Sequence, residues 1–264
     1  MRIALLLAIG LATTGARAQE AVRLYAAGSL RAALTEAGDA FRARTGTAVE
    51  GTFGASGLLR ERIEKGEHAD VFASANMEHP RSLEKAGRGG PVRLFARNRL
   101  CALVAPQVKV DSGSLLERML DPTVKLGTST PKADPSGDYA FELFAKAEKL
   151  RPGARAALEA KALKLTGGPD SPPPPRGRTL YGSLVSDGRA DIFLTYCTNA
   201  ADAKRENPAL QVVAVPPPLA VGADYGLTVL KDARGEAGRF ADFILSQEGQ
   251  AILARHGFDP GERR

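Results

Sequence analysis

The regular alternation of strand-like and helix-like segments constrains this chain more than any other feature of its sequence. Short apolar segments are followed by amphipathic segments of helical period along most of the 264 residues. The expected strands are residues 21–27, 49–53, 69–73, 100–105, 124–127, 190–196, 210–215 and 225–230. The expected helices are residues 30–45, 58–65, 80–86, 114–120, 138–150, 154–163, 179–186 and 237–254. Such alternation predicts an α/β fold in which helices cover both faces of parallel sheets.

The N-terminal segment has the pattern of a cleavable export signal. A basic second residue precedes the apolar run 3–11, which is too short to span a bilayer, and Ala16 and Ala18 are the small residues that signal peptidase requires. We therefore expect residues 1–18 to be removed before Gln19, with a buried N-terminal helix as the alternative. No later segment has the apolar length of a membrane span, so the mature protein is expected to be soluble and exported.

Charge and composition exclude several classes of partner. The chain has 36 basic and 30 acidic residues, and its formal net charge is +6. Lys and Arg alternate with Asp and Glu instead of forming a patch, so we expect no nucleic acid partner. Tryptophan is absent and only 6% of the residues are aromatic, which disfavours stacking platforms for sugars or bases. The charge indicates no more than a mild preference for anionic partners.

Motifs for enzymatic chemistry are absent or incomplete. The chain has neither a Walker-type phosphate loop nor a dinucleotide fingerprint after the first strand. Residues 54–57 (GASG) resemble the nucleophile elbow of hydrolases, but Leu58 stands where the second glycine is required. The three histidines, His68, His79 and His256, are far apart in the sequence and are expected at the surface. We therefore expect no cofactor, no protein-bound metal ion and no catalytic step.

A serine lies in the turn between a strand and a helix at three places, residues 28–30, 55–57 and 135–137. Helix N-termini present amide N–H groups and a partial positive charge, and serine adds a hydroxyl donor. In a parallel α/β sheet such turns lie at one edge, so together they would bind a small oxyanion through neutral donors. The alternative is that each serine only caps its own helix, and for a single turn that alternative is the stronger one.

Several segments of the chain resemble the periplasmic molybdate-binding proteins of ABC transporters. The resemblance begins with residues 22–30 (VRLYAAGSL), where an alanine-rich strand end is followed by Ser-Leu. It continues in residues 51–76, with a Phe-x-x-Ser turn, a helix and the segment Ala-Asp-Val-Phe. The other similar segments are residues 99–106, 135–140, 184–196 and 240–258. Together they cover most of the mature chain, and the similarity is interrupted at the proline run 172–175.

The resemblance implies the two-lobed type II periplasmic binding fold, in which each lobe is a mostly parallel sheet flanked by helices and two strands cross at the hinge. Lobe I is then expected to comprise residues 19–98 and 226–264, and lobe II residues 99–225. The implied function is that of a monomeric periplasmic receptor, which binds molybdate or tungstate between its lobes and delivers this tetrahedral oxyanion to a membrane permease. Sulfate, phosphate or a small organic anion is the nearest alternative ligand, and an exported enzyme on the same fold is the alternative of a different class.

Five residues match ligand contacts of that family. Ser29 and Ser56 match two hydroxyl donors of lobe I, each of which also offers its own amide N–H. In lobe II, Ser136 matches a contact made through a backbone amide, Arg178 falls at another such position, and Tyr196 matches a tyrosine whose hydroxyl reaches the anion. The resemblance thus implies a site that is made of neutral donors from both lobes.

Asp134 departs from the family's pattern, because an acid is unexpected beside an anion-binding turn. Two interpretations stay open at this point. Its side chain either caps the helix expected at 138–150 and points away from the anion, or it indicates a different ligand.

The two cysteines, Cys101 and Cys197, also lie outside the family's pattern, near the expected hinge. Export favours oxidation, and the chain has no third cysteine that could offer another partner. We therefore expect a disulfide between them, with two buried thiols as the alternative.

Overall fold

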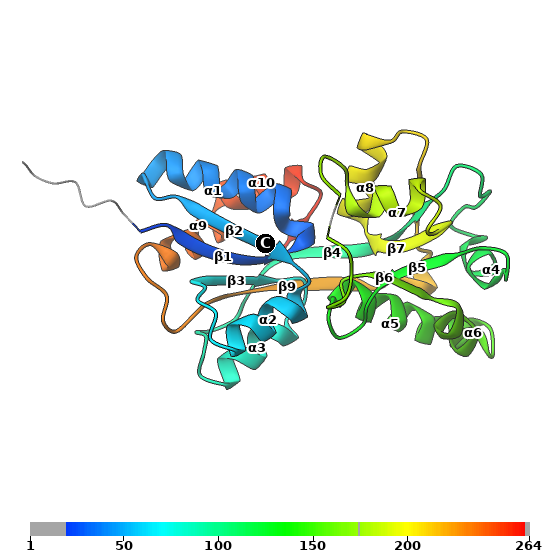
Figure 1. Cartoon of the computed structure of the whole chain (residues 1–264), viewed down its shortest axis with the longest axis horizontal. Coiled ribbons are helices and arrows are strands. Elements are labelled where there is room, and N and C mark those ends of the chain that lie inside the picture. Colours follow the sequence, from blue (N-terminus) through cyan, green and yellow to red (C-terminus); the bar gives the residue numbers. More distant parts are fainter. Residues whose placement is uncertain (1–19, 174, 262–264) are drawn as a thin grey trace, which may run out of the picture.

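The computed structural model describes residues 20–173 and 175–261 (Figure 1). The predicted export signal, residues 1–18, and one proline of the run 172–175 lie outside the described residues. Within the described ranges, no helix is long and apolar enough to cross a membrane. Figure 1 shows two halves side by side, each of which is a sheet with helices on both faces.

The first half is built on strands in the order β2-β1-β3-β9-β4. These strands are β1 (Val22–Ala27), β2 (Val49–Gly54), β3 (Val71–Ser74), β9 (Gly222–Val229) and the beginning of β4 (Arg93–Val104), with the short β10 (Asp259–Pro260) beside β4. β1 pairs in parallel with β2 and β3, whereas β9 runs antiparallel between β3 and β4. One face is covered by α1 (Arg31–Thr45), α9 (Ala237–Leu245) and α10 (Gln247–Arg255), and the other by α2 (Ser56–Glu64) and α3 (Glu78–Lys85).

The second half is built on strands in the order β4-β7-β5-β6, with β8 also paired to β4. Its own strands are β5 (Leu126–Ser129), β6 (Leu163–Thr166), β7 (Ile192–Tyr196) and β8 (Gln211–Ala214). β5 is parallel to β6 and β7, whereas β4 is antiparallel to β7 and β8. One face is covered by α4 (Leu115–Leu120), α5 (Pro135–Leu150) and α6 (Ala154–Lys161), and the other by α7 (Leu180–Ser186) and α8 (Cys197–Glu206). Single 3-10 turns, η1 (Gly28–Leu30) and η2 (Pro217–Leu219), follow β1 and precede β9.

Strand β4 joins the two sheets. Its residues from Arg93 to Arg99 pair with β9, and its residues from Leu100 to Val104 pair with β7 and β8. β9 lies wholly in the first sheet and is the second connection between the halves. The lobe boundaries expected at 98/99 and 225/226 therefore fall inside these two connecting strands, and we retain them as a proposal.

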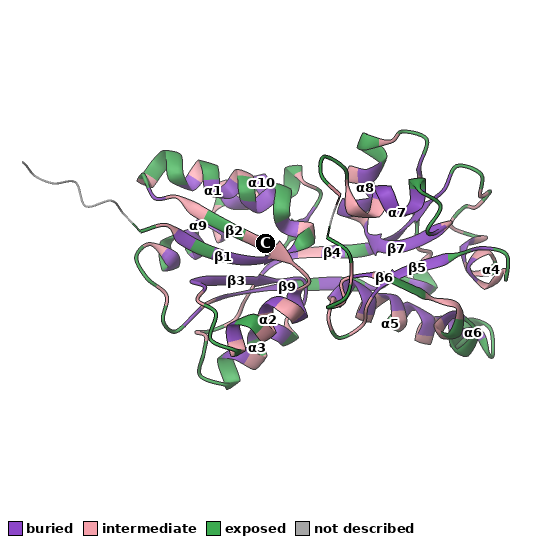
Figure 2. Cartoon of the chain, in the orientation of Figure 1, coloured by how far each residue is buried: buried purple, intermediate pink, exposed green. Residues whose placement is uncertain are grey.

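The strands at the centre of each sheet are buried along nearly their whole length (Figure 2). Their sequences, such as VFAS in β3 and IFLTY in β7, contain almost only apolar and small residues, because helices cover both faces of the sheet. The edge strand β2 is only partly covered and tolerates the exposed Glu50. Polar residues that face the space between the two halves lie in the turns that follow β1, β2, β5 and β7.

The predicted disulfide is confirmed. Cys101 in β4 is bonded to Cys197, the first residue of α8, with their Cα atoms 4.8 Å apart. Leu100 and Tyr196 are paired across β4 and β7 directly before the two cysteines. The bond therefore fixes the turn after Tyr196 to the strand that connects the halves.

The structure corrects three expectations about the elements. The sheets are mixed, because β4 and β9 run antiparallel to their neighbours. The long helix expected at 237–254 is two helices, because Ser246 is extended and its side chain accepts a hydrogen bond of 3.2 Å from the Gly249 amide, which starts α10. Helix α8 was not expected, since its sequence CTNAADAKRE buries little more than small residues and has no large apolar stripe.

Candidate ligand-binding site

A cleft of about 640 Å³ lies between the two halves and is lined by turns of both. The first half contributes residues around Ser29, from η1, and around Ser56, at the start of α2. The second half contributes Asp134, the proline-containing segment after β6, Arg178 and Tyr196. Four of the five predicted ligand residues therefore line one cleft: Ser29, Ser56, Arg178 and Tyr196. The fifth, Ser136, is fully buried and does not line the cleft.

None of the three turn serines caps its own helix. The N-cap of η1 is Ala27 and that of α2 is Ala55, and neither accepts a side-chain capping bond. The N-cap of α5 is Asp134, not Ser136. The capping role that serine usually has at such turns therefore does not account for these three serines.

The Ser56 hydroxyl is oriented by a backbone amide of a neighbouring strand end. The amide of Ala75, directly after β3, donates a hydrogen bond of 3.1 Å to Ser56 Oγ, and Ser56 is only 1% exposed. A hydroxyl has one hydrogen to donate and two lone pairs that accept. Because the Ala75 amide uses a lone pair, the hydroxyl hydrogen of Ser56 is available to a ligand in the cleft.

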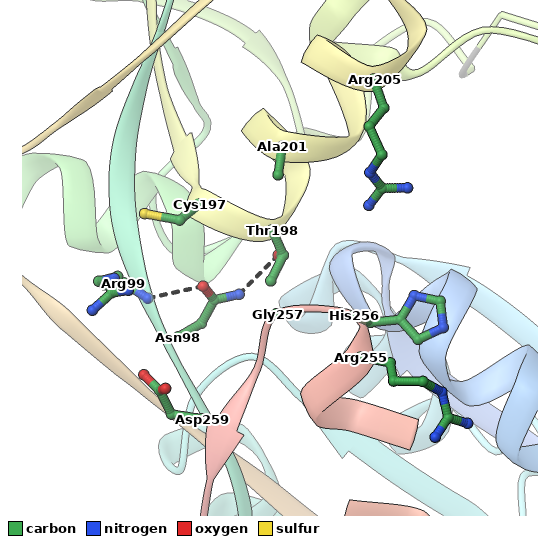
Figure 3. Close-up of a pocket in the computed structure, with 10 residues that line it drawn as sticks. All are labelled: Asn98, Arg99, Cys197, Thr198, Ala201, Arg205, Arg255, His256, Gly257 and Asp259. Carbon is green, nitrogen blue, oxygen red and sulfur yellow. Dashed lines mark hydrogen bonds between the residues drawn. The ribbon is translucent and has the colours of Figure 1, made fainter. Parts of the chain in front are cut away.

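The Ser29 hydroxyl is oriented by a hydrogen-bonded relay that starts at the hinge. The Asn98 side-chain oxygen accepts from the Arg99 amide at 2.9 Å, which fixes the orientation of the Asn98 side-chain amide (Figure 3). The nitrogen of that amide donates to Thr198 Oγ1 at 2.9 Å and lies 3.5 Å from the Tyr225 hydroxyl. The Tyr225 hydroxyl, to which Asn98 points, lies 3.0 Å from Ser29 Oγ, and either oxygen can donate in this hydrogen bond. When Tyr225 donates, the Ser29 hydrogen is left for a ligand.

Tyr196 is the last residue of β7, and it is the only tyrosine among the five predicted ligand residues. Its side chain is 2% exposed, and its oxygen has no hydrogen-bond partner within the described part of the chain. The ring packs edge-on against Tyr225, with centroids 5.6 Å apart. Burial raises the pKa of Tyr196 well above its usual value, so the hydroxyl stays protonated and can donate.

Asp134 lines the cleft and also caps helix α5. Its Oδ1 accepts a hydrogen bond of 3.0 Å from the Ser136 amide, which is the amide that the family resemblance assigns to the anion. The capping interpretation is thus confirmed, but the side chain still borders the cleft. Burial raises the pKa of Asp134 to about 6, while the hydrogen bond from the Ser136 amide opposes the rise. The side of the cleft formed by the second half therefore presents a carboxyl group where the resemblance predicts a backbone amide.

Arg178 is neutralised by two acids. Its guanidinium lies 3.1 Å from an oxygen of Asp187 and 3.7 Å from one of Glu206. The other charged residues that line the cleft are Arg31, Asp134 and Asp202. Because acids and bases nearly balance there, the cleft offers hydrogen-bond donors instead of a strong positive field.

The two halves touch beside the cleft. The Gly57 amide at the start of α2 donates a hydrogen bond of 2.9 Å to the carbonyl oxygen of Ala133, in the turn before α5. A Cβ atom at Gly57 would lie 2.5 Å from the carbonyl oxygen of Lys132, so only glycine allows this approach. A second contact joins the Tyr139 hydroxyl of α5 to the carbonyl oxygen of Ala75, at 3.4 Å. Sequence reasoning placed Gly57 in an incomplete hydrolase motif and in one of the three serine-containing turns, and it missed this contact.

Two further residues of the site, Asn98 and Tyr225, were also missed. Each is a polar residue at the edge of an apolar strand, and the expected crossing of the chain near both of them was the only signal available. His79, expected at the surface, is buried in α3, and burial lowers its pKa to about 4. None of the three histidines lines the cleft. Over residues 20–173 and 175–261, no three His, Cys, Asp or Glu side chains are close enough to hold a metal ion.

A smaller pocket of about 300 Å³ lies at the hinge, behind Asn98 (Figure 3). Arginines and a histidine from both halves surround it. These basic side chains are mostly engaged: Arg205 pairs with Asp202, and both Arg255 and His256 pair with Glu36. We therefore interpret this pocket as a gap left where α8 packs against the end of α10. The cleft, with its oriented hydroxyls, is the stronger candidate for a binding site.

Comparison with known proteins places the chain in a family. The sequence model of the bacterial extracellular solute-binding proteins matches residues 22–259. The chain belongs to this family. A protein of Pasteurella multocida that carries no functional description, PM1146, is 39% identical over 241 residues, which cover 90% of this chain and 98% of that protein. The molybdate-binding protein ModA of Mycobacterium tuberculosis H37Rv is 28% identical over 262 residues, which cover 93% of this chain and 86% of ModA.

Solved structures agree in fold. The sulfate-binding protein SubI of Mycobacterium tuberculosis H37Rv superposes with a TM-score of 0.75 at 20% identity, over 91% of this chain and 87% of SubI. At this identity the likeness shows the fold alone. This family member thus has the two-lobed α/β fold of the type II periplasmic binding proteins, in which β4 and β9 are the strands that connect the lobes.

Proposed function

We propose that this protein is the periplasmic solute-binding component of an ABC transporter, and that it binds a tetrahedral oxyanion, molybdate or tungstate, in the cleft. The observation that carries the proposal is the state of three hydroxyls, Ser29, Ser56 and Tyr196. Ser56 accepts from the Ala75 amide, Ser29 is hydrogen-bonded to the Tyr225 hydroxyl, and Tyr196 has no partner among the described residues. All three can therefore donate to one ligand from both lobes.

Neutral donors suit a small dianion that must be released again. Hydrogen bonds to a charged acceptor are stronger than those between neutral groups, and burial between the lobes strengthens them further. A ligand that bridges Ser29 and Ser56 in one lobe and Tyr196 in the other favours the closed arrangement over the open one. The closed form would then be the one that the membrane permease recognises.

The ligand class rests on relatives as well as on the site. ModA of Mycobacterium tuberculosis is named a molybdate-binding protein, and its likeness to this chain extends over 93% of the chain. We therefore propose molybdate and tungstate first. The cleft volume of about 640 Å³ is in the range of pockets that hold larger small molecules, and this favours a small organic anion with an oxyanion group as the second candidate.

The test is isothermal titration of the mature protein with molybdate, tungstate, sulfate and phosphate. We expect molybdate or tungstate to bind with one ion per chain. Ser29→Ala and Ser56→Ala should each weaken binding by about 1–3 kcal/mol, because each removes a donor to a charged acceptor.

Ser246→Ala is the matched control. Ser246 is a true N-cap, whose side chain accepts from the Gly249 amide, and it lies outside the cleft. Its loss should lower stability by about 1 kcal/mol and leave the affinity unchanged. If Ser29→Ala and Ser56→Ala behave like Ser246→Ala, these serines are structural and the proposed site is wrong.

A further inference from the structure

The carboxyl group of Asp134 is held in the wall of the cleft by the backbone around it. Its Oδ1 accepts from the Ser136 amide at 3.0 Å. On the other side the chain makes room for it at Gly167, where a Cβ atom would lie 2.6 Å from the Asp134 Cβ and 2.7 Å from Oδ2. Gly167 also has a φ of +79°, which strongly favours glycine. The backbone at Ser136 and Gly167 therefore fixes the position of the Asp134 carboxyl group.

No basic residue among those described forms an ion pair with this carboxyl group. Its own helix contributes a further acid, Asp138, whose charge also opposes ionisation of Asp134. Burial raises the pKa of Tyr181, from α7, and of Tyr196, from β7, and the charge of Asp134 raises both further. Both hydroxyls therefore stay protonated. Lys132, two residues before Asp134, is exposed, and its amide donates to Asp138 at 2.7 Å.

The other charged residues of the cleft do not compensate Asp134 either. They are Arg31, Arg178, Asp202 and Glu206. Arg31 lies over the Phe53 ring in the first half, 4.8 Å from its centroid. Arg178 and Asp202 are already paired with other side chains. An oxyanion in the cleft therefore meets a carboxyl group that forms no ion pair with a described basic side chain.

Two anionic oxygens cannot share such a site unless a proton lies between them. A carboxylate only accepts hydrogen bonds, and so does a fully deprotonated oxyanion such as molybdate or sulfate. Like charges at close range raise the pKa of one group until the pair holds a proton, and the resulting O–H···O⁻ bond is short and strong.

We propose that the cleft binds its oxyanion together with one proton, which Asp134 shares with a ligand oxygen. The inference rests on the proposed function, since it concerns the same cleft. An oxyanion that brings its own proton, such as hydrogenphosphate or a phosphonate, donates it to the Asp134 carboxylate. An oxyanion without a proton, such as molybdate, binds only as Asp134 takes one up from solvent.

The direction of the pH dependence follows. Without ligand the Asp134 carboxyl has a pKa of about 6, and a bound dianion beside it raises that pKa further. Above pH 6, molybdate binding therefore takes up a proton, and its affinity falls by up to tenfold for each unit of pH. Below pH 6 Asp134 is already protonated, so the uptake and the pH dependence both fade.

The test is isothermal titration with molybdate and with phosphate, at pH 5 and pH 8, in two buffers of different ionisation enthalpy, which counts the protons. For the parent protein at pH 8 we expect an uptake close to one proton with molybdate and close to none with hydrogenphosphate. At pH 5 the uptake with molybdate should be close to zero.

Asp134→Asn gives the sharper result, because asparagine can still accept from the Ser136 amide but cannot ionise. At pH 8 this variant should bind molybdate more tightly and hydrogenphosphate more weakly than the parent, each by about tenfold, with no proton uptake for molybdate. Asp224→Asn is the control, since Asp224 does not line the cleft and pairs with Arg97, and it should leave the proton count unchanged.

The outcomes separate the two proposals. If molybdate binds the parent at pH 8 without proton uptake, or if Asp134→Asn leaves both affinities unchanged, the proton proposal is wrong while the cleft still binds oxyanions. If neither ion binds at either pH, the proposed function fails and the proton proposal fails with it.

Discussion

The two walls of the cleft are built differently. In the lobe I wall, the hydroxyls of Ser29 and Ser56 are already held by Tyr225 and by the Ala75 amide. In the lobe II wall, the Tyr196 hydroxyl has no partner among the described residues, and Asp134 is partly buried with a raised pKa. A preorganised wall loses little on binding, whereas the other wall holds polar groups whose burial is compensated only by a ligand. The contrast suggests an order of events: the ligand docks on lobe I and lobe II closes over it.

The disulfide gives the largest expected effect, because it anchors the lobe II wall to β4. It links residues 96 apart, and in the chain-entropy model a loop of that length stabilises the folded state by about 4–5 kcal/mol. We expect the protein with Cys101→Ser and Cys197→Ser to lose about that much free energy of unfolding in urea. Hydrogen exchange should increase first in the turn after Tyr196, and not around Ser56. If hydrogen exchange increased equally after Tyr196 and around Ser56, the proposed difference between the two walls would be wrong.

Asp134 should make the ligand-free protein less stable as the pH rises. Its pKa is about 6 in the folded protein against a model value of 3.8, so the folded state holds the proton more tightly. The corresponding stabilisation is complete below pH 3.8 and is lost as the pH rises through 6. At pH 8 we therefore expect Asp134→Asn to raise the free energy of unfolding by up to about 3 kcal/mol relative to the parent. The two proteins should differ little at pH 4, and thermal melting at both pH values checks this.

Removing one hydroxyl from each wall compares the two directly. Tyr196→Phe should weaken oxyanion binding by about 1–3 kcal/mol and leave the ligand-free protein equally stable or slightly more stable, because the buried hydroxyl has no partner to lose. Ser56→Ala should weaken binding by a similar amount but also destabilise the ligand-free protein by about 1 kcal/mol, because the Ala75 amide loses its acceptor. Titration and urea unfolding of both variants measure the four quantities. A clear loss of stability in Tyr196→Phe would show that its hydroxyl has a structural partner.

The relay behind Ser29 gives the smallest effect. Tyr225→Phe keeps the ring packing against Tyr196 but removes the hydroxyl that is hydrogen-bonded to Ser29. The Ser29 hydroxyl can then rotate, so we expect binding to weaken by about 0.5–1.5 kcal/mol, less than in Ser29→Ala. An effect as large as that of Ser29→Ala would mean that Tyr225 contacts the ligand itself.

Much of the fold could be predicted from the sequence because it follows from local patterns. Alternating apolar and amphipathic segments indicated the α/β fold, and the Ser-containing turns indicated three places at one sheet edge. What the patterns could not give were the long-range relations. The antiparallel course of β9 between β3 and β4 depends on strand pairing across more than a hundred residues of chain.

The site shows the same limit. Ser29, Ser56 and Tyr196 could be found from their positions after strands and from the family resemblance. The role of Asn98 could not, because its hydrogen bonds to Thr198 and toward Tyr225 join residues 100 and 127 positions apart. Asp134 was recognised as unusual, but whether it caps α5 or borders the cleft depended on the fold around Gly167, which lets it do both.

The most direct test of the central claim is a crystal structure of the protein soaked with tungstate, with the metal located by its anomalous scattering. The proposed function predicts one strong peak in the cleft, with ligand oxygens within hydrogen-bond distance of Ser29 Oγ, Ser56 Oγ and the Tyr196 hydroxyl. A peak only in the basic pocket at the hinge, lined by Arg205 and Arg255, would contradict it, as would a cleft that stays empty at saturating tungstate.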